Sequence, residues 1–137
     1  SAASDVYKRQ VKGYSLKSGA VATSVAHDSH NIITVGCNDD DIAVAVNAIK
    51  DSKGGIAVVE NGKIKALLEL PIAGLMSDEP LTTVNEKLEN AKLSAYELGA
   101  DKSIDPFMTL SFLSLPVIPS LRITTKGVFD AENWKML

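Results

Sequence analysis

The spacing of apolar residues predicts two helices on either side of a β-hairpin. In the first helix, residues 39–50, apolar positions recur at i, i+3, i+4 and i+7; these positions are Ile42, Ala45, Val46 and Ile49. The second helix covers residues 81–98, and its apolar face is marked by Val84, Leu88, Ala91, Ala95 and Leu98. Residues 55–70 are predicted to form two strands joined at Asn61-Gly62, because both residues tolerate the positive φ of a tight hairpin turn.

Polar residues at the helix ends agree with these boundaries. Asn38 suits an N-cap, and the aspartates at 39, 40 and 41 place negative charge in the first turn, where the helix dipole favours it. We interpret these aspartates as capping and solvated residues rather than as metal ligands. Thr83 and Glu86 have the spacing of a capping box, and Gly99 is placed to close the second helix.

The flanking segments complete an α+β pattern. Small and β-branched apolar runs predict strands over residues 20–26 and 31–36, and an edge strand over 121–124. Residues 107–115 are dense in apolar side chains, and their pattern does not separate helix from strand. Asp105-Pro106 is expected to break any helix, and Trp134 to pack back onto the body. The order of elements predicts an α+β fold with a mixed, largely antiparallel sheet and two main helices packed on it.

A polar segment between the first two predicted strands is the first candidate site. It holds both histidines of the chain, His27 and His30, together with Asp28, Ser29 and Asn31. Asp, Ser and Asn suit a turn, but two imidazoles and a carboxylate exceed what a turn needs. A His-x-x-His pair is a weak metal signal, because a closed site needs more ligands. A structural role and a substrate-facing role remain open alternatives.

The loop before the second helix is the second candidate. Asp78 and Glu79 could act as general acid or base, since paired carboxylates in an apolar pocket can have separated pKa values. The same Ser77-Asp78-Glu79-Pro80 run is also ordinary chemistry for a helix N-terminus. The chain has no Gly-x-Ser-x-Gly elbow, phosphate loop or dinucleotide fingerprint.

Composition restricts the function classes further. The 137 residues suffice for one domain, and 45% apolar and 23% charged residues are typical of a globular protein. A net charge of −3 without a basic cluster argues against nucleic-acid binding, and no apolar run is long enough for a membrane span. The single cysteine, Cys37, fits a reducing compartment, so we expect a cytoplasmic protein. Residues 1–10 do not lead into the pattern and are interpreted as a foreign or disordered leader to a domain over residues 11–137.

Three parts of the chain resemble the C-terminal domain of bacterial adenine deaminase, in the amidohydrolase superfamily. The first comprises VKGYSLKSGA and SVAHDSHNII, residues 11–20 and 24–33. The second is LPIAGLMSD, residues 70–78. The third comprises DPFMTLSFL and LPVIP, residues 105–113 and 115–119. These matches follow the family order and extend over nearly everything after Gln10, whereas residues 1–10 do not resemble the family.

The resemblance implies a fragment of an enzyme that hydrolyses adenine to hypoxanthine and ammonia in purine salvage. In this family a (β/α)8 barrel holds two divalent metal ions, manganese or iron, which activate the attacking water. This chain has no His-x-His and is too short for a barrel. The resemblance therefore implies that the catalytic barrel is absent from this chain, that the chain binds no metal, and that in isolation it is inactive. The implied partners are adenine and the missing barrel, and a homo-oligomer is left open.

The resemblance also suggests roles for the two polar loops, which we expect to lie near each other and to face the barrel. The residues expected to face the active site and assist catalysis are His27, Asp28, His30 and Asp78. The candidate substrate-binding residues are Ser29, Asn31, Ser77 and Glu79. The alternative is a stand-alone, non-catalytic binding or regulatory module of the same fold.

Overall fold

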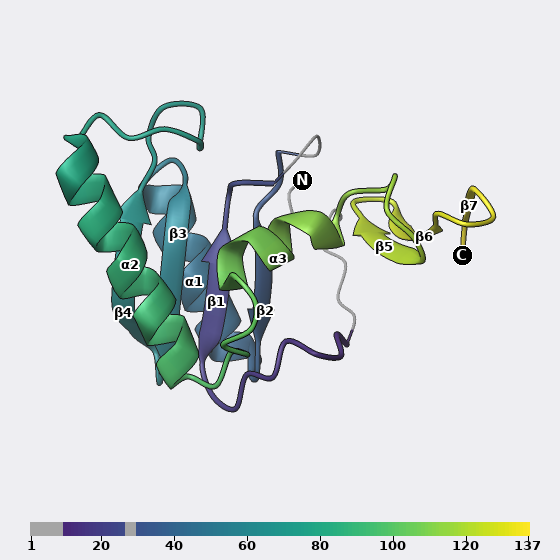
Figure 1. The fold of residues 1–137 in the computed structure, drawn as a ribbon, viewed down its shortest axis with the longest axis horizontal. Coiled ribbons are helices and arrows are strands. Elements are labelled where there is room, and N and C mark those ends of the chain that lie inside the picture. The colour runs from purple at the N-terminus through teal and green to yellow at the C-terminus, as the bar shows by residue number, and fades with distance from the viewer. Residues whose placement is uncertain (1–9, 27–29) are drawn as a thin grey trace.

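A four-stranded antiparallel sheet forms the centre of the molecule, in the order β2-β1-β3-β4 (Figure 1). The computed structural model describes residues 10–26 and 30–137. The strands are β1 Ala20–Thr23, β2 Ile33–Gly36, β3 Gly55–Glu60 and β4 Lys63–Glu69. Every pairing in this sheet is antiparallel. The predicted α+β class is confirmed, and so is the hairpin, whose turn is formed by Asn61 and Gly62 at positive φ.

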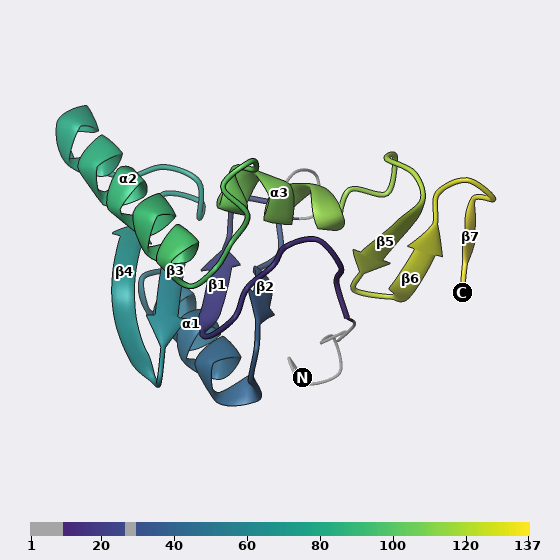
Figure 2. The same ribbon diagram turned by 60° about the horizontal axis from the view of Figure 1, so that its bottom comes forward.

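Helices cover both faces of this sheet (Figure 2). Helix α1, Asp39–Asp51, packs on one face, while α2, Leu81–Glu97, and α3, Pro106–Leu113, pack on the other. Successive strand residues point to opposite faces, so β1 contributes Ala20 to the α1 side and Val21 to the α2 side. None of the helices described is long and apolar enough to cross a membrane.

The start of α1 is tied to the turn of the hairpin through Asp41. The Asn38 side chain accepts a hydrogen bond from the Asp41 backbone N–H at 2.8 Å, which confirms the predicted N-cap. The buried Asp41 carboxylate accepts from Asn38 Nδ2 at 2.8 Å and from the Gly62 N–H at 2.7 Å. These hydrogen bonds lower the pKa of Asp41 below its ordinary value. The capping interpretation therefore holds for Asp41, but the expectation that it is solvated is wrong, because its carboxylate is buried where it joins α1 to the hairpin turn.

The predicted capping box at Thr83 and Glu86 is wrong. Helix α2 begins directly after Pro80, which has extended geometry at φ −58° and ψ 146° and makes no side-chain cap hydrogen bond. Because the proline starts the helix at Leu81, Thr83 and Glu86 already lie inside its first turns.

Asp105-Pro106 starts a helix, contrary to expectation, and residues 107–115 are mainly helical. The Asp105 carboxylate accepts hydrogen bonds from the N–H groups of Phe107 and Met108 at 3.0 and 2.9 Å. Proline is favoured at the first helical position because that residue needs no N–H donor. The buried Tyr14 hydroxyl donates to the Pro106 carbonyl at 2.8 Å and anchors this end of α3.

The C-terminal residues form a second, separate sheet in the order β5-β6-β7. Its strands are Leu121–Thr124, Gly127–Asp130 and Lys135–Met136, so the predicted strand at 121–124 is confirmed. Trp134 does not pack onto the body: its side chain is 70% exposed, and its ring contacts Phe129 edge-on at 5.3 Å between centroids. The reason is that the β6–β7 connection carries Trp134 away from the central sheet (Figures 1 and 2).

Candidate functional site

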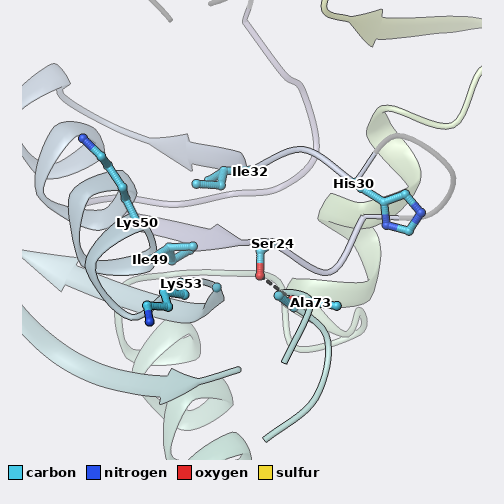
Figure 3. Close-up of a pocket in the computed structure, with 9 residues that line it drawn as sticks. Ser24, His30, Ile32, Ile49, Lys50, Lys53 and Ala73 are labelled. Carbon is cyan, nitrogen blue, oxygen red and sulfur yellow. Dashed lines mark hydrogen bonds between the residues drawn. The ribbon is translucent and has the colours of Figure 1, made fainter. Parts of the chain in front are cut away.

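Three segments of the chain meet at one end of the central sheet, around the hydroxyl of Ser24. Strand β1 ends at Thr23, three residues earlier than expected, because Ser24 turns toward its neighbours. Ser24 Oγ accepts a hydrogen bond from the Gly55 N–H at 2.8 Å and donates to the Gly74 carbonyl at 2.6 Å (Figure 3). One side chain thus joins the exit of β1, the start of β3 and the loop after β4.

The contact between the last two segments requires glycine. A Cβ on Gly54 would lie 2.3 Å from the Cα of Gly74 and 2.8 Å from the carbonyl oxygen of Leu70. Gly54 also has φ +130°, a conformation that residues with side chains rarely adopt. The loop after β4 is therefore held against the start of β3 by a backbone-to-backbone approach.

An open hollow of about 220 Å³ lies beside this junction. Figure 3 shows His30 on one side of it, Lys50 and Lys53 from the end of α1 on the other, and Ser24 between them. Its lining consists of Ser24, His30, Ile32, Ile49, Lys50, Lys53, Gly54, Ala73 and Gly74. Ligand pockets typically measure about 300–1,000 Å³. This hollow is smaller and open, so it would need a further surface to enclose a ligand.

The histidine-bearing segment reaches the hollow through His30. His30 is exposed, has φ +49°, and donates its backbone N–H to the Ala26 carbonyl at 3.3 Å. A non-glycine residue at positive φ is uncommon and stores local strain. Asn31 follows and is half-buried. The other candidates in this segment, His27, Asp28 and Ser29, lie outside the described residues.

The Ser77–Glu79 segment does not line the hollow. Ser77 Oγ accepts from the Glu79 N–H at 3.2 Å, and the Glu79 carboxylate pairs with Lys87 Nζ of α2 at 2.7 Å. The hydrogen bond from Lys87 to Glu79 raises the pKa of Lys87. The negative charge of the exposed Asp78 adds to this increase. The loop containing this segment instead lines the hollow with Ala73 and Gly74, and Gly74 accepts the hydrogen bond from Ser24.

Sequence reasoning missed the residues that build the junction. Ser24 lies three residues before His27, inside one of the segments that resemble adenine deaminase. Gly54 was interpreted only as part of the end of the first helix, and Gly55 as part of that end and as the first residue of the hairpin. Lys50 and Lys53 carry no signal in the sequence, because their place across the hollow from His30 depends on how α1 packs. Within residues 10–26 and 30–137, no three His, Cys, Asp or Glu side chains gather closely enough to hold a metal ion.

Comparison with known proteins gives one consistent result. The family model for the adenine deaminase C-terminal domain matches residues 2–135. The chain is 50% identical over 127 residues to adenine deaminase of Bacillus pumilus, covering 93% of this chain and 22% of that protein. It is 55% identical over 122 residues to the Desulfatibacillum aliphaticivorans protein of the same name, covering 89% and 21%. The chain therefore spans about a fifth of the length of the curated relatives it matches.

Proposed function

We propose a function from the premise that the chain belongs to the adenine deaminase C-terminal domain family. In this proposal it is the C-terminal domain of an enzyme that hydrolyses adenine to hypoxanthine and ammonia. The remaining polypeptide would supply a barrel that holds two divalent ions, manganese or iron. The names of the relatives support the substrate, from which we propose a role in purine salvage. The single cysteine supports a reducing compartment such as the cytoplasm.

The observation that carries this proposal is the hollow at the end of the sheet. It joins the His30 side to the loop after β4, and both segments resemble the family. It is also open to solvent, so it would need a second wall to enclose a ligand. A domain that closes one side of an active site, while a larger domain supplies the other, would have this form.

The roles proposed for this chain are contacts with adenine and the movement of protons. Hydrolysis adds water at the ring carbon that bears the amino group, so the water must lose a proton and the departing ammonia must gain one. Imidazole and carboxylate groups transfer protons effectively near neutral pH. We assign this assistance to His27, Asp28 and His30. The polar groups proposed to hold the purine are Ser29 and Asn31. Because Ser77, Asp78 and Glu79 do not line the hollow, they are given no role in this proposal.

The metal ions are proposed to lie outside this chain. The described residues contain no cluster that fits such an ion. If the proposal is correct, removing a polar group of the turn should therefore impair turnover without releasing metal.

The test uses the full-length enzyme that carries this domain. Asp28→Asn or His30→Ala should lower turnover by about 100-fold or more, the scale of one general acid–base group. Metal content and thermal unfolding should stay at the parental level. Asp40→Asn, at an exposed carboxylate in the first turn of α1, is the matched control and should leave turnover unchanged. Variants at Asp28 and His30 that unfold the protein, or that retain parental turnover, would show that the turn is structural.

A further inference from the structure

The C-terminal sheet has no core of its own. Strands β5, β6 and β7 pair with one another, and within residues 121–137 only Gly127 is buried. The apolar side chains of this sheet are Leu121, Ile123, Val128, Phe129, Trp134, Met136 and Leu137. Small sheets need an apolar face buried against something else to be stable. This one extends beyond the end of α3, and none of the described helices lies over it (Figures 1 and 2).

Apolar side chains are exposed on both faces of the sheet. Leu121 pairs with Asp130, which pairs with Lys135, so these three residues share one face. Met136 pairs with Phe129 and therefore lies on the opposite face. Leu121 is 52% exposed and Met136 is 44% exposed. Neither face is therefore sealed by the domain itself.

The nature of the missing cover follows from the comparisons and from this two-sided exposure. Relatives of this chain are about four times its length, and the matching region is their C-terminal domain. The rest of such a polypeptide would be covalently linked to this domain and so present at high effective concentration. A two-fold contact between copies of this chain through one face would leave the apolar residues of the other face in water. Because apolar residues on both faces of the sheet need cover, the remaining part of a longer polypeptide is favoured over a second copy of this chain.

We propose that the β5-β6-β7 sheet is the surface by which this domain binds the remaining part of an adenine deaminase polypeptide, which covers both of its faces. Trp134 and Met136 are contacts in this interface. This inference rests on the proposed place of the chain within a longer deaminase, but it is independent of the catalytic roles given to the histidine-bearing turn.

The experiment compares the 137-residue chain with a hybrid in which it replaces the matching segment of the Bacillus pumilus relative. Hydroxyl-radical footprinting with mass spectrometry reads side-chain exposure at Trp134 and Met136 in the sheet, and at Met76 in the loop after β4. Oxidation of Trp134 and Met136 should fall by about five-fold or more in the hybrid, because an interface core excludes water. Leu121→Asp should restore their oxidation in the hybrid. Leu93→Asp, at an exposed leucine of α2, is the matched control and should not.

Three results would overturn the inference. The first is equal oxidation of Trp134 and Met136 in the hybrid and in the 137-residue chain. The second is protection of both residues that grows with the concentration of the 137-residue chain alone, which would identify a second copy as the cover. The third is protection of Met76 without protection of Trp134 and Met136. That last result would leave the proposed function standing, because the larger domain would then contact the candidate site alone.

Discussion

At the scale of single residues, Ser24 is the side chain on which the candidate site depends most directly. Its hydroxyl pairs with the Gly55 N–H and with the Gly74 carbonyl. We predict that Ser24→Ala lowers the free energy of unfolding by about 1–3 kcal/mol, because the buried Gly55 loses the partner of its N–H. Urea unfolding of the 137-residue chain measures this loss.

A matched control shows whether the destabilisation comes from the place of Ser24 in the fold or would follow the loss of any serine hydroxyl. Ser103 also makes a side-chain hydrogen bond, to Asp101 at 2.7 Å, but both residues are exposed. Ser103→Ala should change the free energy of unfolding by less than about 0.5 kcal/mol, as is usual for surface positions. Equal losses in the two variants would show that the junction at Ser24 does not hold the loops together.

At the scale of elements, the loop after β4 is fixed to the start of β3 by glycine. We predict that Gly54→Ala lowers the free energy of unfolding by about 3 kcal/mol or more, since φ strain adds to a clash with backbone. The added Cβ would meet Gly74 and Leu70 at distances that no rotamer can relieve. Thermal or urea unfolding of the variant measures the loss.

Gly62, in the hairpin turn, is the matched control for Gly54. It also has positive φ, +73°, but a Cβ there would have nothing within 4 Å. Gly62→Ala should therefore cost only the conformational strain, about 1–2 kcal/mol. If Gly54→Ala were no more destabilising than Gly62→Ala, the close approach of the two segments would not be a feature of the folded protein.

At the scale of the whole molecule, this chain presents one side of the proposed active site. We predict that the purified chain, supplied with adenine and manganese or iron, forms no hypoxanthine above a heat-denatured control. The hollow is open to solvent, and the proposal places the metal ions in a barrel that 137 residues are too few to form. Chromatographic detection of hypoxanthine provides the measurement. Formation well above the control would contradict the proposed division of labour between this chain and the barrel.

The sequence alone determined the elements whose signals are local. Asn38 caps α1, the hairpin turns at Asn61-Gly62, and the two long helices begin at the expected residues. Capping, turn conformation and helical periodicity are each decided within a few neighbouring residues, so they can be read along the chain. The three family-like segments likewise identified the family, which the comparisons confirm.

Tertiary structure decided what depends on residues far apart in the chain. The apolar run after Pro106 has no polar face to give a period, and the start of its helix is anchored by Tyr14, 92 positions away. The Asp105 cap of this helix is a local signal that the sequence interpretation missed. Ser24 reaches Gly74 across 50 positions because β1 and β4 end, and β3 begins, at the same side of the sheet. Trp134 is exposed because its strands pair with each other instead of with the central sheet. Such contacts leave no periodic trace in the sequence, since they arise only when strand register and helix packing bring distant segments together.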